Sequence, residues 1–496
     1  MPEGVRPSVG MVKEESRLRL LTSAIFTLTL SILGSSVLPV PFAFSRMGVL
    51  LGVLTMAVVA YSNSLTSVLL LRAAGLTGHD SYEGVAQAVG GRVWKVVTQV
   101  SLILLLFGTV IGDFALLADV GQRALRRLTP SAPTLLVGYD GRGIMVLLTL
   151  CVVLPLCLLR KMRSLETAAQ AGVLIVMALA GIIVTEAAQY GFPAIRNGEL
   201  PLWGIKPNAD LPEAFAVLGF AFYVQPMLMP LLHELPPGPS SVTITCQAVR
   251  IVVGIVASAV YGVIGIFGAA RYGAKTEGNV LVNEWLGGPA EGFLDLAIAA
   301  YLSISVPPMQ MSCRYTLDVL LAGEDAPFSP YRHTMETLFI VFSSLAVALA
   351  FPTGAEKIFA VTGATAVCIV CYVIPVALHL KIYYSPGGYT QQPRRLEANG
   401  LHQPLLQDGI GGMREEKLAG PSSNEERCRG EVDPIPAETG SSSAACEEDV
   451  RRGMGKWLEF GQEVVLPVIV AVLGVGFSVA ALWVSLSTAL WPKPND

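Results

Sequence analysis

Long apolar runs follow one another along the chain, separated by shorter polar segments. A run of about 20 apolar residues is long enough to cross the hydrocarbon core of a bilayer as an α-helix. With a window of that length the sequence predicts eleven membrane-spanning helices. They are expected near residues 22–45, 48–71, 93–119, 143–159, 168–190, 213–234, 247–272, 292–313, 334–351, 356–382 and 462–490. The predicted fold class is therefore an all-α polytopic membrane protein.

Two of these runs contain residues that interrupt a helix. The first includes the sequence ILGSSVLPVPFAF, in which two prolines follow a Gly-Ser-Ser triplet. Proline lacks the backbone donor and its ring clashes with the preceding turn, so we expect the helix to break between Gly34 and Pro41. The sixth run includes FAFYVQPMLMPLLHEL, where the Gln-Pro pair predicts a second interruption at Val224–Pro226, with Pro230 beyond it.

An interruption at membrane depth leaves backbone amides and carbonyls without partners, at a cost of roughly several kcal/mol each. Such a break is tolerated only where it lines a cavity or is covered by protein. Paired interruptions, one in each half of the chain, are typical of the substrate site of a secondary transporter. We therefore expect spans 1–5 and 6–10 to form a five-plus-five inverted repeat with an eleventh helix appended. The alternative is that both sets of prolines only kink packed helices.

The chain divides into four segments. An N-terminal tail, 1–21, precedes a transporter core, 22–383, and helix 11 with the C-terminus occupies 456–496. The segment between them, 384–455, is rich in Gln, Glu, Gly, Ser, Pro and Arg and poor in aromatic residues, which predicts a disordered linker. The basic residues that precede the first span predict that the tail and the linker are cytoplasmic.

Composition narrows the class further. Of 496 residues 52% are hydrophobic and 15% charged, too apolar a mixture for a soluble enzyme. The net charge of −4 argues against a nucleic-acid partner. We find no Walker pattern, metal-ligand cluster or catalytic triad, so the sequence predicts neither an enzyme nor an ATP-driven pump, and no cofactor or metal.

The interruptions suggest where a zwitterion would bind. A carboxylate is stabilised by free amides at the positive end of a helix, and an ammonium by carbonyl oxygens. The half-helix that begins near Val37–Pro41 offers the amides, and small residues before it let a ligand approach the backbone. The break at Val224–Pro226 offers carbonyls from the other repeat. The predicted substrate contacts are Gly34, Ser35, Ser36 and Val37 from span 1, and Tyr223 and Gln225 from span 6.

Several stretches together resemble a known family. They are LSILGSSVLPVPFAFSRMGVLLG, SYEGVAQAVGG, LFGTVIGDFALLADV, FAFYVQPMLMPLLHEL, GNVLVN and SISVPPMQMSCRYTL, in that order. They resemble the amino acid/auxin permease superfamily, and within it the sodium-coupled neutral amino acid transporters, from about Thr22 to Lys381. The resemblance implies an eleven-span, LeuT/APC-like inverted repeat with broken helices 1 and 6. It also implies amino acid transport by alternating access, coupled to Na⁺ or H⁺.

The residues that the resemblance assigns to the coupling ion are only partly present. The family has an Asn that helps hold Na⁺ four residues before the glycine matching Gly34, and here that residue is Leu30. The hydroxyl that the family contributes from span 8 is matched by Ser305. Loss of an amide oxygen weakens a sodium site.

Asp113 lies inside span 3, where the family pattern has an uncharged residue. An acid at the bilayer centre costs roughly 2.5–3.5 kcal/mol and usually faces a polar interior. It suits proton coupling or an ammonium partner. The other interpretation is that span 3 is tilted and Asp113 lies near the outer surface.

The sequence thus predicts a secondary active transporter of neutral amino acids in a plasma or an endolysosomal/vacuolar membrane. Its partners would be the amino acid and the lipid bilayer. One alternative is a proton-coupled permease that uses Asp113. Another is an amino acid sensor that does not transport and signals through the linker 384–455.

Overall fold

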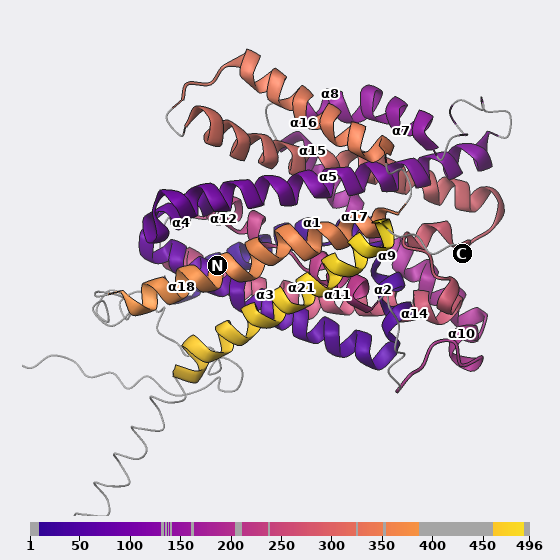
Figure 1. Cartoon of the computed structure of the whole chain (residues 1–496), viewed down its shortest axis with the longest axis horizontal. Coiled ribbons are helices and arrows are strands. Elements are labelled where there is room, and N and C mark those ends of the chain that lie inside the picture. The colour runs from indigo at the N-terminus through magenta and orange to yellow at the C-terminus, as the bar shows by residue number, and fades with distance from the viewer. Residues whose placement is uncertain are drawn as a thin grey trace, which may run out of the picture.

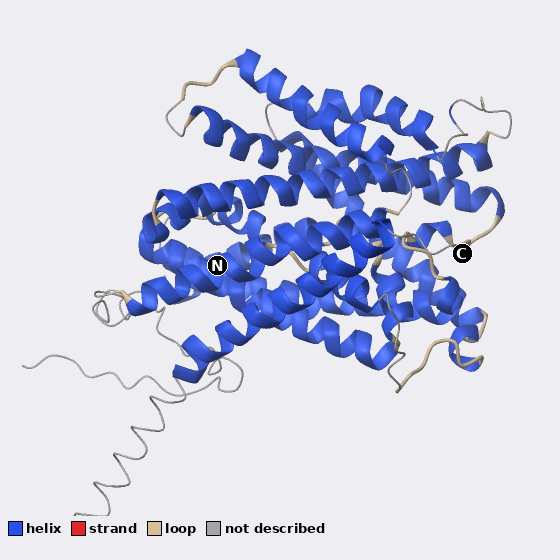
Figure 2. Cartoon of the chain, viewed as in Figure 1, coloured by secondary structure: helices blue, strands red, loops and turns tan. Residues whose placement is uncertain are grey.

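The computed structural model describes most of the chain outside the linker. The described residues are 9–129, 133, 136, 138, 141–159, 163–203, 211–236, 239–323, 326–350, 354–385 and 460–490. Every regular element among them is a helix, and none is a strand, as Figure 2 shows. This confirms the predicted all-α class. The predicted disordered linker lies outside the described residues except for its first two, Tyr384 and Ser385.

Nine helices in the described part are long and apolar enough to cross a membrane, or ten if the bent pair at the N-terminus is one span. These spans are Val49–Thr77 (α3), Arg92–Leu128 (α5), Gly172–Gln189 (in α9), Leu211–Glu234 (α11, α12), Ser240–Lys275 (α13, η4, α14, η5), Gly288–Ala322 (α15), Pro330–Ala350 (α16), Ala355–Tyr384 (α17, η7, α18) and Gly461–Val484 (η9, α21). The run predicted at 143–159 falls on a shorter helical stretch, Arg142–Cys157. The count of eleven and the inverted repeat stay predictions.

The first span is broken where the sequence predicts. Helix α1 (Val9–Ile32) ends before the Gly-Ser-Ser triplet, one 3-10 turn follows at Ser35–Val37 (η1), and α2 (Val40–Met47) then begins. The helical segments Arg17–Ile32 and Ser35–Met47 are bent by 61° relative to each other. Pro41 lies in the first turn of α2, where a missing N–H costs nothing. Helix α1 begins inside the segment 1–21, which the sequence assigns to a tail.

The sixth span is interrupted earlier than predicted. Helix α11 (Leu211–Ala221) ends before residues 222–224, and α12 (Gln225–Glu234) begins at the Gln-Pro pair. Pro226 lies in the first turn of α12, where the backbone N–H that proline lacks would have no partner within the helix. Pro230 lies inside the continuous helix α12. The expected site at Val224–Pro226 is therefore corrected to residues 222–224.

The helices pack side by side into one bundle (Figure 1). Helices α5 and α15 make the most extensive contact, and α2 packs against α14 (Ser258–Tyr272) and α11. Phe44 of α2 is fully buried between Gly52 of α3 and Gly265 of α14. A Cβ added at either glycine would lie 2.6 Å or 2.4 Å from the Phe44 ring. The absence of side chains at these two residues therefore lets α2 sit close to α3 and α14.

Ion pairs fasten the ends of α5 and α15 to each other. Arg123 pairs with Asp295 at 3.3 Å, and Arg127 pairs with Glu291 at 3.1 Å and with Asp295 at 3.4 Å. The acidic side chains are each 1% exposed. Glu291 also accepts hydrogen bonds from the backbone N–H groups of Trp285 and Gly287, both at 3.0 Å.

Candidate functional site

The break in span 1 frees carbonyl groups that two tyrosines cover. The Tyr261 hydroxyl of α14 contacts the carbonyl oxygen of Ile32 at 2.5 Å. The Tyr301 hydroxyl of α15 donates to the carbonyl oxygen of Leu33 at 2.7 Å. Ile32 is the last residue of α1 and Leu33 follows it, so no further helical turn exists to satisfy their carbonyls. Spans 7 and 8 thus supply partners that the broken helix lacks.

Tyr261 also connects the two interruptions. Its hydroxyl lies 3.0 Å from the carbonyl oxygen of Ala221, the last residue of α11, and 3.2 Å from the Ser36 hydroxyl. The Tyr261 side chain is fully buried and packs edge-on against Phe222, with ring centroids 5.1 Å apart. The broken backbones of spans 1 and 6 therefore meet at one phenol.

The predicted span 1 residues lie in this region. Ser35, Ser36 and Val37 are buried and form the turn η1. A Cβ added at Gly34 would meet nothing within 4 Å, so the backbone beside that residue faces open space. A cavity of about 10 Å³ adjoins Gly34 and Tyr301. Since one water needs roughly 10–15 Å³, an amino acid enters only if the helices move apart.

Asp113 of α5 faces the same break. The residue is 1% exposed, and its carboxyl interacts with the Ser35 side chain. The phenols of Tyr223 and Tyr301 both interact electrostatically with it. Its Oδ1 atom is buried and makes no hydrogen bond with the described residues. Asp113 is therefore buried inside the bundle, and its role in coupling or substrate binding stays a prediction.

The two predicted residues of span 6 differ in their contacts. The Tyr223 hydroxyl lies 3.4 Å from the Thr109 hydroxyl of α5, on the side that faces Asp113. Gln225 is fully buried and anchors the start of α12. Its Oε1 accepts from the N–H of Val224 at 3.0 Å, and its Nε2 donates to Asn63 and Thr66 of α3, both at 3.2 Å.

The three predicted ion ligands, Leu30, Ser305 and Asp113, differ in what their side chains offer, and their role in ion binding stays a prediction. The Ser305 hydroxyl donates to the carbonyl oxygen of Leu302 in its own helix at 2.9 Å. Leu30 is partly buried near the end of α1 and has no polar side-chain atom to offer. Among the described residues, no three His, Cys, Asp or Glu side chains gather into a metal-binding group.

Three residues at the site are absent from the sequence prediction: Tyr261, Tyr301 and Asn63. A buried phenol needs a hydrogen-bond partner, so tyrosines inside the apolar runs 247–272 and 292–313 are a usable signal. Asn63, which donates to the Tyr372 hydroxyl at 2.8 Å, is likewise a polar residue inside a predicted span.

An all-helical bundle with two interrupted spans and membrane-length helices defines a multi-pass membrane protein of the transporter class. The chain belongs to the transmembrane amino acid transporter protein family, whose model matches residues 21–394. This covers the region from Thr22 to Lys381 that resembles the amino acid/auxin permeases. The family consists of transporters and not of enzymes.

Relatives at low identity agree with the family. The chain is 25% identical over 373 residues to human "Solute carrier family 38 member 10" (71% of this chain, 32% of the relative). It is 25% identical over 368 residues to the Xenopus laevis "Putative sodium-coupled neutral amino acid transporter 10" (71% and 34%). It is 24% identical over 379 residues to the Arabidopsis thaliana "Amino acid transporter AVT6E" (72% and 75%). The matched region spans about a third of the first two relatives' length.

Proposed function

We propose that this protein is a secondary active transporter of neutral amino acids that works by alternating access and is coupled to Na⁺ or H⁺. The observation that carries the proposal is the Tyr261 hydroxyl, which contacts the carbonyl oxygens of Ile32 and Ala221 at the two interruptions. Interrupted helices that meet at the middle of the bundle supply unsatisfied backbone groups to a solute. The names of the relatives support amino acids as the substrate class.

The substrate's two charges have separate partners in this proposal. Its carboxylate binds the backbone amides of Ser35 and Ser36, ahead of α2, and that of Val37 once its 3.3 Å hydrogen bond to the Gly34 carbonyl oxygen opens. Its ammonium group faces the carbonyls of residues 222–224 and the Asp113 carboxyl. Tyr223 contributes a phenol on the α5 side of the site. The open space beside Gly34 lets the ligand's main-chain atoms approach the backbone.

A specific observation favours H⁺ over Na⁺ as the coupling ion. Asp113 is buried beside the broken helix with one oxygen unpartnered, whereas Leu30 offers no ligand and Ser305 bonds to its own helix. A carboxyl in such a place either carries a proton or pairs with a cation, because an unpaired charge at membrane depth is expensive. Proton coupling through Asp113 is therefore the second candidate.

The decisive experiment is uptake of a panel of amino acids into proteoliposomes, with Na⁺ replaced by choline and with or without an inward pH gradient. Concentrative uptake of neutral amino acids supports the proposal. An uptake rate that is independent of Na⁺ but rises with external acidity supports proton coupling. An uptake rate that depends on Na⁺ excludes proton coupling. Tight binding of an amino acid without flux under every gradient would overturn the transporter assignment.

Asp113→Asn separates the coupling candidates further. If Asp113 carries the proton, the variant loses concentrative uptake driven by a pH gradient, by about 10²-fold, as expected for removal of a proton-transfer group. It keeps exchange of labelled for unlabelled substrate, because exchange needs no net proton movement. Asp119→Asn, on the same helix, is the matched control and keeps both activities. Loss of both exchange and uptake in Asp113→Asn would assign Asp113 to substrate binding instead.

A further inference from the structure

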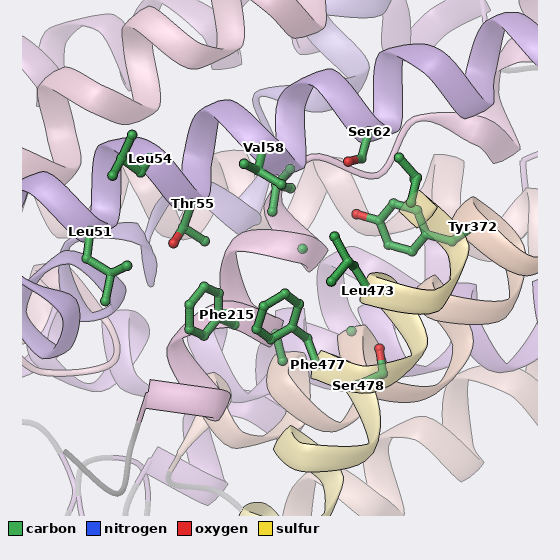
Figure 3. A pocket seen from close by; sticks show the side chains of 16 residues that line it. Leu51, Leu54, Thr55, Val58, Ser62, Phe215, Tyr372, Leu473, Phe477 and Ser478 are labelled. Carbon is green, nitrogen blue, oxygen red and sulfur yellow. The ribbon is translucent and has the colours of Figure 1, made fainter. Parts of the chain in front are cut away.

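A second cavity, of about 280 Å³, lies between spans 2, 6, 10 and 11. Figure 3 shows α3 on one side, α21 on the other and α11 at the base. We call it the α3–α21 groove. Its lining includes Thr55 and Val58 of α3, Phe215 and Gly219 of α11, and Leu473 and Phe477 of α21 (Leu466–Leu490).

The groove opens onto the outer surface of the helix bundle, between apolar side chains that are exposed. Helix α21 packs closely on α11 and η7 (Gly363–Val373) but makes few contacts with α3, which leaves a gap between α3 and α21. The membrane-crossing part of α21 is only 22% buried, the least of the nine spans in the described residues. Val58 is 53% exposed and Leu473 48% exposed at the edges of the gap. In a bilayer, these exposed apolar side chains would face lipid hydrocarbon.

We propose that the α3–α21 groove binds one acyl chain of a membrane lipid. Its lining is mostly aliphatic and aromatic, and the hydroxyl groups of Thr55, Ser62, Tyr372 and Ser478 are its polar side-chain groups. The volume lies just below the range of about 300–1,000 Å³ typical of drug-sized ligands, which suits one flexible chain and not a fused-ring molecule. A lipid chain is the apolar solute present at high concentration on that side.

The walls are shaped for a chain rather than for a headgroup. The rings of Phe215 and Phe477 stack across α11 and α21, with centroids 4.7 Å apart and planes 19° apart. Gly219 leaves the base open, because an added Cβ there would meet nothing within 4 Å. An apolar space of this kind forfeits dispersion contacts unless hydrocarbon fills it.

Binding there would act on the broken sixth span. Helix α11 ends at Ala221, where the interruption begins, and both Phe215 and Gly219 belong to α11. A chain held between α3 and α21 fills space that α11 would cross if it shifted against α21. Occupancy of the groove thus stabilises the arrangement of helices described here, and this inference holds whichever solute or ion the protein carries.

The test is photolabelling in lipid nanodiscs with a phosphatidylcholine that carries a diazirine on one acyl chain, followed by peptide mapping by mass spectrometry. We expect labels on α3 and α21 residues that line the groove. Gly219→Leu should place a side chain in the open space and lower that labelling about tenfold. Gly476→Leu, at an exposed glycine of α21 with equally open surroundings, is the matched control and should leave the labelling unchanged.

Val58→Phe provides a second obstruction that leaves the core untouched, since Val58 is half exposed, and it serves if Gly219→Leu fails to fold. Labelling that neither substitution lowers would overturn the proposal. So would labels spread evenly over the outward face of α21, which indicate ordinary surrounding lipid. Displacement of the label by a sterol, but not by unlabelled phosphatidylcholine, would show a different occupant and reject the acyl chain.

Discussion

One buried phenol, that of Tyr261, contacts the backbone at both interruptions. Tyr261 comes from a helix that is itself unbroken at that point, and its hydroxyl reaches the ends of both α1 and α11. Loss of a hydrogen-bonding partner strands a buried carbonyl, at about 1–3 kcal/mol. The arrangement makes the two interruptions depend on one residue outside either of them.

Replacement of Tyr261 by Phe should lower both stability and uptake. We expect a loss of about 1–3 kcal/mol in unfolding free energy, because the carbonyls at the breaks lose their partner. Thermal unfolding in detergent and initial uptake rates in proteoliposomes measure the two effects. Tyr82→Phe is the control, since the Tyr82 hydroxyl donates to the carbonyl oxygen of Val370 at 2.6 Å away from the interruptions. Equal damage to uptake by both substitutions would contradict a special role for Tyr261.

Two roles are open to Gln225, and one substitution distinguishes them. If its amide only anchors α12 to α3, Gln225→Leu destabilises the protein by about 1–3 kcal/mol and leaves the KM for the amino acid unchanged. If Gln225 contacts the substrate, as the sequence predicts, KM rises even in variants that remain folded. Unfolding curves and uptake at several substrate concentrations distinguish the two.

At the scale of helices, the close approach of α2 to α3 and α14 depends on glycine. Gly265→Ala places a methyl group 2.4 Å from the Phe44 ring and forces α2 to shift. Overpacking of this kind costs about 1–3 kcal/mol. We expect lower uptake, measured in proteoliposomes, because α2 begins directly after the turn η1. Adding Phe44→Leu should restore activity, and Gly254→Ala, which meets nothing within 4 Å, should have no effect.

The position of the second interruption shows what a proline pattern can and cannot specify. Pro41 and Pro226 both lie in the first turn of a half-helix, so each marks a helix start. In span 1 the break lies between Gly34 and that start, as predicted. In span 6 it lies before the Gln-Pro pair, at residues 222–224, which carry no breaking residue of their own. A proline therefore predicts where the following helix begins better than where the preceding helix ends.

Over the whole molecule, apolar runs predict the helices well, and long-range polar contacts poorly. Ten of the predicted spans coincide with membrane-length helices once the bent pair is counted, because hydrophobic length alone defines them. The bond from Tyr261 to Ile32 joins residues 229 apart in sequence, and nothing local to either residue indicates the other. Asp113 was recognisable because an acid within an apolar run is rare, whereas Asn63 gave a weaker signal.

The ion pairs between α5 and α15 hold the bundle together on a larger scale. Asp295→Asn leaves Arg123 and Arg127 with less negative charge in a site where Asp295 is 1% exposed. Breaking a buried pair costs about 3–5 kcal/mol, so we expect a large fall in the melting temperature. Asp80→Asn, in the exposed pair with His233, should change it little. A loss for Asp295→Asn that vanishes in high salt would contradict burial of the pair.

A phenol has one hydrogen to donate, yet the Tyr261 hydroxyl lies within reach of two carbonyl oxygens, one at each interrupted span. At any instant the phenol donates to only one of them, and the Ser36 hydroxyl, 3.4 Å from the Ile32 oxygen, is a second donor at that end. When the phenol donates to Ile32, the carbonyl oxygen of Ala221 can accept a hydrogen bond from a water molecule or from the amino group of a solute. A residue with two hydrogens to donate would satisfy both oxygens at once and would leave neither of them for a solute.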